Sequence, residues 1–310
     1  MNNHQKLFDC KYPIIEAGMN IGSQLELALA VSEAGAFPSL CIFPRREGDK
    51  TDFSPMFDGL KEFIKANGSP NVIVPIGAPL VTHRDFFTIA KDLKISHWDI
   101  FPRINDRRVC CSEMVDDPRI YAGFKALRQY SHILGRVYNV SDNPKMKVFS
   151  GLELKSLEGG GGRGKLSGKE FFEKQIAAMD HNLIPFGGIG SPEQVKYYID
   201  HGAIAVGIGT MFAATVESPV STASKERMVQ ATSSDIQFLP ELGLNALLFD
   251  KSIIDRPPDD AGDLNRTEQL HRGVYGDGTQ GLIYVGESID YVDRIRTVKE
   301  TVDHLVSLLK

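Results

Sequence analysis

Two glycine-containing turns have the residue types needed to hold a phosphate group. Gly187 and Gly188 follow the short apolar segment 183–186, and Gly209 and Thr210 follow the apolar segment 203–208. Glycine lets backbone N–H groups approach an anion closely, and a helix that starts after such a turn adds partial positive charge. Two turns of this kind on consecutive units predict a phosphate site. The alternative is that these glycines only make tight turns.

A third glycine-rich segment follows the apolar segment 148–154. Four successive glycines, 159–162, lie between Lys155 and Arg163. Because glycines are costly to order, such a run is expected either in a plain linker or where backbone must come close to a ligand. Its place directly after an apolar strand favours a backbone surface for a flat or anionic ligand.

Two side chains are candidates for catalysis. We place His97 at the carboxyl end of the fourth strand, beside Trp98 and Asp99, where an imidazole could act as a general acid or base. The alternative for His97 is a histidine packed in a loop. Arg163 stays protonated and would act as an electrophile toward a carboxylate or thioester oxygen. The four cysteines form no Cys/His ligand spacing, so the sequence predicts no metal site.

The elements that must position these residues alternate between short apolar segments and longer segments with helical spacing. Eight strand–helix units in series predict a (β/α)8 TIM barrel, in which the carboxyl ends of the strands form the active face. An open doubly wound sheet is the alternative, and it is disfavoured because no G-x-G-x-x-G follows the first strand. The expected strands are 13–17, 36–43, 71–76, 95–101, 133–138, 148–154, 183–186 and 203–208.

The regular alternation stops after the eighth strand. Residues 217–280 are polar and rich in proline and glycine, which predicts a small helical or loop insertion over the barrel mouth. Residues 1–216 and 281–310 would then form the barrel. Residues 298–309 have apolar side chains at helical spacing and predict a closing amphipathic helix.

Composition excludes several classes of protein. The chain has 310 residues, of which 42% are hydrophobic and 24% charged, with a formal net charge of -5. These values are typical of a globular protein, and without a run of lysine or arginine nucleic acid is not an expected partner. No run of eighteen apolar residues and no signal-peptide pattern occur, so we expect a cytoplasmic protein without a membrane span.

Four segments have recognisable sequences: YPIIEAGMN, the loop EGGGGRG, GGIGSPEQV and AIAVGIGTMFAATVESP. They resemble the nitronate monooxygenase family, once called 2-nitropropane dioxygenases. The resemblance covers most of residues 11–220 and, weakly, 281–309. That family also includes FMN-dependent enoyl-acyl-carrier-protein reductases and NADH:quinone reductases.

The resemblance implies a TIM barrel that holds one FMN, with its phosphate bound by the loops after strands seven and eight. It also implies an oxidoreductase that oxidises a small carbanion-forming substrate such as a nitronate. The positions that match the family's flavin-binding motifs are Met19, Lys155, Glu158, Gly160, Gly161, Gly187, Gly188, Gly209 and Thr210.

The chain departs from the family pattern at three places, one of which is the end of the third strand, where the family commonly has an asparagine and residues 74–78 read VPIGA. The family's presumed catalytic histidine is replaced by Gly162, and the usual proline before Met19 is Gly18. Two further functions therefore stay open: an NAD(P)H-dependent reductase of an enoyl thioester or quinone, and a flavin-binding protein without nitronate activity. The expected partners are a small-molecule substrate with O2 or NAD(P)H, and the sequence leaves the oligomeric state open, a homo-oligomer included.

Overall fold

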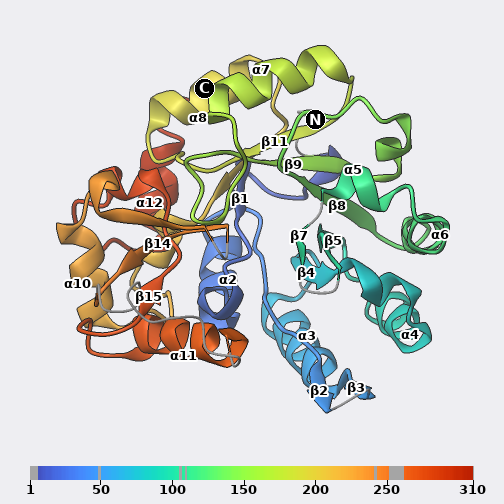
Figure 1. Cartoon of the computed structure of the whole chain (residues 1–310), viewed down its shortest axis with the longest axis horizontal. Helices are drawn as coiled ribbons and strands as arrows, with labels where there is room; N and C mark the ends of the chain where they lie inside the picture. The colour runs from blue at the N-terminus through green and yellow to red at the C-terminus, as the bar shows by residue number, and fades with distance from the viewer. Residues whose placement is uncertain are drawn as a thin grey trace.

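A parallel β-sheet forms the centre of the molecule. The computed structural model describes residues 6–47, 50–104, 107–108, 110–240, 243–250 and 262–309. Seven strands pair side by side in the order β1, β12, β11, β9, β8, β5 and β4 (Figure 1). Their bounds in that order are Ile14–Glu16, Val206–Ile208, Leu183–Phe186, Gly151–Lys155, His132–Val137, His97–Phe101 and Ile73–Gly77.

An eighth, irregular strand closes this sheet into a barrel. Phe37 exchanges backbone hydrogen bonds with β1, donating to the Ile14 carbonyl at 2.8 Å and accepting from the Glu16 N–H at 2.9 Å. On the other side, the Ile73 N–H donates to the Pro38 carbonyl at 2.9 Å. The predicted strand 36–43 is therefore much shorter, because Pro38 has no N–H to donate to a ladder. The predicted TIM barrel is confirmed.

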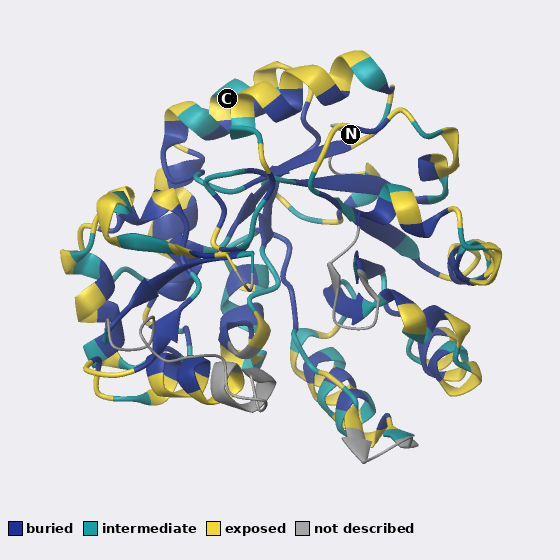
Figure 2. Cartoon of the chain, in the orientation of Figure 1, coloured by how far each residue is buried: buried dark blue, intermediate teal, exposed yellow. Residues whose placement is uncertain are grey.

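Helices between the strands cover the outside of the barrel. They turn a buried face toward the strands and an exposed face toward solvent (Figure 2). In α3, for example, Met56, Leu60 and Phe63 are buried at helical spacing. The covering helices are α2 (Leu25–Glu33), α3 (Ser54–Asn67), α4 (Arg84–Leu93), α6 (Pro118–Leu127), α7 (Gly168–Ala178), α8 (Pro192–Asp200) and α12 (Val298–Leu305).

The segment after β12 adds helices and an antiparallel sheet beside the barrel (Figure 1). Its elements are α9 (Thr210–Ala213), α10 (Thr222–Gln230), β13 (Ile236–Leu239), β14 (Leu244–Leu248), α11 (Gly262–Tyr275) and β15 (Leu282–Ile283). The pairing order is β10, β14, β13, with β15 also on β14. Because β10 (Gly161–Gly162) comes from the glycine-rich loop, the sheet joins this segment to the barrel. The proline-rich stretch from residue 256 lies mostly outside the described residues.

The remaining short elements lie in the loops of the barrel, except for η4 and η6, which belong to the segment after β12. No helix within the described ranges is long and apolar enough to cross a lipid bilayer. The short elements are η1 (Asn20–Gly22), β2 (Arg45–Glu47), β3 (Lys50–Asp52), η2 (Ala78–Thr82), β6 (Arg103–Ile104), β7 (Arg107–Arg108), α5 (Cys111–Met114), η3 (Pro144–Val148), η4 (Ser233–Asp235) and η6 (Glu287–Tyr291).

Candidate functional site

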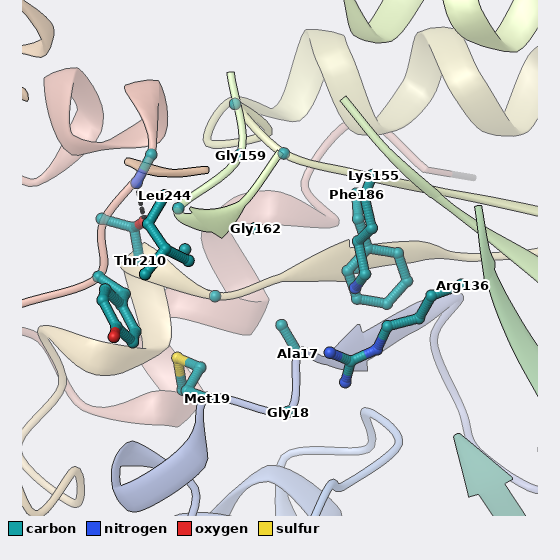
Figure 3. A pocket seen from close by; sticks show the side chains of 18 of the residues that line it. Ala17, Gly18, Met19, Arg136, Lys155, Gly159, Gly162, Phe186, Thr210 and Leu244 are labelled. Atoms are coloured by element: carbon teal, nitrogen blue, oxygen red, sulfur yellow. Dashed lines mark hydrogen bonds between the residues drawn. The ribbon is translucent and has the colours of Figure 1, made fainter. Parts of the chain in front are cut away.

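A cavity of about 250 Å³ lies at the carboxyl ends of the barrel strands. This volume is near the lower end of the range of about 300–1,000 Å³ that is typical of small-molecule sites. Its walls come from the loops after β1, β5, β8, β9, β11 and β12, and from residues 284–288 (Figure 3). The predicted site residues that the structure brings together here are Met19, Lys155, Gly160, Gly161, Gly162, Gly187, Gly188, Gly209 and Thr210.

The turn after β11 requires glycine for backbone reasons. Gly187 and Gly188 have φ values of 106° and 68°, which side-chain-bearing residues rarely adopt. A Cβ on Gly188 would also lie only 2.7 Å from Glu158 Cβ. The two N–H groups just before α8 are not free, because Gln194 Oε1 accepts from both Gly190 and Ser191, at 2.9 and 3.1 Å. An anion in this turn would therefore be held by residues before Gly190 rather than by the helix end.

Gly209 differs from these two glycines because neither its backbone nor its neighbours exclude a side chain. Its φ is -116°, and an added Cβ would lie 3.4 Å from Ala17 Cβ and 3.8 Å from Met19 Sδ, which are ordinary contact distances. The missing side chain leaves the cavity wall open at this point. The next residue, Thr210, accepts a hydrogen bond from the Gly286 N–H at 2.9 Å and so fixes the segment 284–288 against α9.

The glycine-rich loop is shaped by close packing as well as by the cavity. A Cβ on Gly160 would lie 2.6 Å from the carbonyl carbon of Val285, and one on Gly286 would lie 2.3 Å from the Glu158 carbonyl oxygen. Backbone therefore meets backbone here, with no room for side chains. The sequence predicts that the four glycines serve a ligand, but at Gly160 packing alone requires glycine, although the residue also lines the cavity.

Glu158 does not line the cavity, which is a correction to its expected place at the cofactor. Its carboxylate accepts hydrogen bonds from the Gly168 N–H at 3.0 and 3.2 Å, and its carbonyl accepts from the Glu287 N–H at 2.9 Å. These bonds hold the glycine-rich loop to the start of α7 and to the segment 284–288. Glu158 therefore holds the glycine-rich loop in position.

The expectation that His97 reaches the active face is wrong. His97 is the first residue of β5, so it lies at the opposite end of the barrel from the cavity. It is buried and stacks on Phe8 and His132, with ring centroids 4.9 Å away in each case. Burial lowers the pKa of His97 well below its usual value, and the neighbouring His132 adds to this effect. His97 is a neutral packing residue, so it cannot exchange protons with a ligand in the cavity.

Arg163 also lies elsewhere than expected. It is not among the residues that line the cavity; its guanidinium carbon lies 3.6 Å from the ring centroid of Phe238 on β13. Stacking of this kind is a common use of arginine at a protein surface. The expected role as an electrophile at the ligand is therefore not supported by its position.

Four charged side chains inside the barrel lie at and below the floor of the cavity, and we call them the ionic layer: Asp99, Arg136, Glu153 and Lys155. Arg136 Nε lies 2.9 Å from each carboxylate oxygen of Asp99 and 3.5 Å from Glu153 Oε2. Lys155 Nζ lies 2.8 Å from Glu153 Oε2, in an ion pair whose angles are poor for a hydrogen bond. Only the two cations of the layer line the cavity, so the layer presents positive charge to a ligand.

Burial and neighbouring charges together set the protonation of this layer. Burial raises the pKa of Glu153, and Asp99 raises it further, while Lys155 opposes both. Burial lowers the pKa of Lys155, and Glu153 opposes that change. For Arg136 burial acts against the charge, but Asp99 and Glu153 outweigh it and raise the pKa above its usual value. Arg136 is therefore a permanent cation at the cavity floor.

A further buried carboxyl group, that of Glu16 on β1, lies outside the cavity lining. Burial raises the pKa of Glu16 to about 8, although the Ser39 N–H donates to Glu16 Oε2 at 3.0 Å and opposes the rise. Glu16 is therefore largely neutral at pH 7. The sequence analysis assigns no role to Glu16, Arg136 or Glu153. The available signal was a charge inside an apolar strand, because a buried charge must find a partner.

The fold and the site define a (β/α)8-barrel protein with a cavity at the carboxyl face, between glycine turns and a cationic floor. The sequence profile of the nitronate monooxygenase family matches residues 154–307, about half of the chain. The chain therefore belongs to the nitronate monooxygenase family, and the protein is an oxidoreductase. No curated protein sequence matches the chain.

Solved structures support the fold. FabK from Thermotoga maritima has a TM-score of 0.77 at 21% identity, over 99% of this chain and 95% of that chain. Nitroalkane oxidase from Streptomyces ansochromogenes has a TM-score of 0.77 at 16% identity, over 99% and 97%. The enoyl reductase domain of MlnA from Bacillus amyloliquefaciens has a TM-score of 0.65 at 13% identity, over 98% and 95%.

Proposed function

We propose that the protein is an FMN-dependent oxidoreductase that oxidises a small carbanion-forming substrate such as an alkyl nitronate, with O2 as the electron acceptor. The family match supports a flavin as the cofactor class. The observation that carries the proposal is that the glycine turns after β11 and β12 and the cationic floor line the same cavity. One phosphate-sized site without a second dinucleotide fingerprint favours FMN over FAD.

The residues present fit this cofactor. The backbone of Gly187, Gly188, Gly209 and Thr210 would hold the phosphate, and the open wall at Gly209 is a cradle that a side chain would fill. Met19 would contact the flat ring system; its N–H is fixed by a 3.0 Å hydrogen bond to Ser23 Oγ. When bound, the flavin supplies the two-electron redox chemistry, while the protein orients it and binds the substrate.

Because Gly162 provides no general base, the protein is expected to oxidise fewer kinds of substrate. A neutral nitroalkane must lose a proton before it can be oxidised, and a positioned base contributes about 10²–10⁴-fold to such a step. Gly162 lines the cavity but has no side chain, and His97 lies at the far end of the barrel. A nitronate is already deprotonated, so its oxidation needs no base from the protein. We therefore expect nitronates to be used in preference to the parent nitroalkanes.

The first measurement identifies the chromophore of the purified protein. The purified protein should be yellow and should release FMN on denaturation, as identified by chromatography. Oxygen uptake is then measured with ethyl nitronate and with nitroethane. A colourless protein that cannot be reconstituted with FMN would sink the cofactor proposal.

Measurements on the same purified protein distinguish the two alternative functions. Anaerobic bleaching of the flavin by NADH or NADPH, without oxygen uptake on nitronate, would replace our proposal by a reductase of an enoyl thioester or quinone. Bound FMN with no turnover of any of these substrates would leave a flavin-binding protein.

A further inference from the structure

We propose that Arg136 determines substrate specificity by binding a planar anion with two oxygens, such as a carboxylate or a nitronate. The inference rests on the proposed function of this cavity and specifies the class of substrate that it takes. Three observations support it: the ion pairs that fix the Arg136 side chain, the guanidinium donors without a partner, and the open space beside Gly18.

Arg136 is held in place along one edge only. Nε and Nη2 both contact the Asp99 carboxylate, and Nε also faces Glu153. A guanidinium has five N–H donors, and the two on Nη1 have no partner among the described residues. The guanidinium extends from β8 toward Ala17 and Gly18 at the cavity (Figure 3). Donors therefore remain on a side chain whose orientation is already fixed.

The acids that hold Arg136 lie deeper than Arg136 itself. The side chains of Asp99 and Glu153 are 1% and 2% exposed, whereas that of Arg136 is 15% exposed and lines the cavity. A ligand therefore meets the cation first, with the carboxylates behind it. If Arg136 were only a counter-ion for the two acids, all of its charge would be expected to point away from the cavity.

Lys155 is less suited to bind the anion. Its ammonium nitrogen is paired with Glu153 at 2.8 Å and lies 3.4 Å from the ring centroid of Phe186. Its charge is therefore engaged by a carboxylate on one side and an aromatic face on the other. Among the cations that line the cavity, Arg136 has the planar fork of donors that matches two oxygens.

Gly18 keeps the space beside the guanidinium free. A Cβ on Gly18 would lie 3.3 Å from Arg136 Nη2 and 2.6 Å from Pro75 Cγ. The nearby thiol of Cys41 brings no negative charge, because burial raises its pKa to about 12. A side chain at position 18 would therefore crowd the guanidinium, whereas glycine leaves it open to a ligand.

Arg136 would therefore select between ligands by their charge. An anion gains charge-assisted hydrogen bonds at Arg136, whereas a neutral ligand of the same shape leaves buried donors unpaired. Quinones and enoyl thioesters carry no charge at the reacting group, so this site favours the oxidation of anions over the reduction of those neutral substrates.

The test compares propionate with propionamide, which have nearly the same shape but differ in charge. We expect the purified wild-type protein to bind propionate at least tenfold more tightly, as measured by isothermal titration calorimetry. Arg136→Gln should abolish this preference, and Arg136→Lys should reduce it severalfold because a lysine lacks the fork. Arg119→Gln is the control, because the Arg119 side chain is 87% exposed and its change should leave the preference intact.

Equal affinities of the wild-type protein for the two probes would overturn the inference, and so would a full preference in Arg136→Lys. These two measurements decide the matter even if Arg136→Gln leaves Asp99 unpaired and does not fold. Flavin content is measured on the same samples. A preference for propionate in a protein without flavin would sink the proposed function alone, whereas a flavoprotein without the preference would sink the inference alone.

Discussion

Gly209→Ala should separate ligand binding from folding at the proposed phosphate site. An added Cβ would lie 3.4 Å from Ala17 Cβ and 3.8 Å from Met19 Sδ, so nothing in the protein has to move. The backbone at Gly209 has a negative φ, so no left-handed strain arises. We therefore expect the free energy of unfolding of the apoprotein to change by less than about 1 kcal/mol.

The effect on the flavin should be much larger. The methyl group would enter the open wall of the cavity, where we place the phosphate, and would keep its oxygens from the backbone. Loss of even one charge-assisted hydrogen bond amounts to about 1.5–3 kcal/mol. Because about 1.4 kcal/mol corresponds to a factor of ten, the Kd for FMN should rise by at least tenfold.

The assay is titration of the apoprotein with FMN, followed by quenching of flavin fluorescence, beside urea unfolding of the same apoprotein. Gly68→Ala serves as a control, since Gly68 follows α3 far from the cavity lining. A Gly209→Ala protein that binds FMN within a factor of two of the wild type would refute the placement of the phosphate.

Three further outcomes are expected. Gly188→Ala should lower the free energy of unfolding, measured by urea titration, more than Gly68→Ala does. Both glycines have a positive φ, where alanine costs about 1–2 kcal/mol, but only at Gly188 would the added Cβ also lie 2.7 Å from Glu158 Cβ. Equal losses of stability in the two variants would contradict this packing. Gly162→His should raise oxygen uptake with nitroethane from near zero to a partial rate, and an unchanged rate with flavin still bound would show that an imidazole there cannot reach the substrate. Because the pKa of His97 is depressed, the unfolded chain takes up the proton first, and stability should fall as pH drops below about 6.5, by up to about 1.4 kcal/mol per pH unit. His97→Gln should remove this part of the slope in urea unfolding at pH 5.5 and 7.5, with no change in turnover per bound flavin; an unaltered slope would mean that His97 does not titrate on unfolding.

Local patterns were sufficient to predict the barrel. Apolar runs bounded by turn residues gave the strands, and β11 spans the predicted residues 183–186. Both turns of the proposed phosphate site follow from these strand ends. The length of the second strand was overestimated because the prediction followed its apolar residues and did not allow for Pro38, whose missing N–H limits regular pairing.

The functional side chains were harder to place than the strands, because the two ends of one strand lie on opposite faces of the barrel. β5 runs from His97 to Phe101, and the predicted strand 95–101 ends at the same residue. The error was therefore to assign His97 to the carboxyl end of this strand, whereas it is the first residue of β5. Arg136 and Glu153 could have been found by asking which partner a charge inside an apolar strand would have. The pairing of β10 with β14 could not have been predicted from the sequence, because it joins distant segments that carry no local pattern.

The antiparallel sheet beside the barrel has a consequence for the order of events during synthesis. All barrel strands have been made once Ile208 leaves the ribosome, yet the wall formed by residues 284–288 and the strand that supports β10 come much later. Contacts between segments so far apart form slowly, after the local ones. A nascent or prematurely terminated chain can thus have all its barrel strands and still lack the covering helix α12 and one side of its cavity. If the cavity holds FMN as proposed, cofactor uptake marks the chains that have been completed.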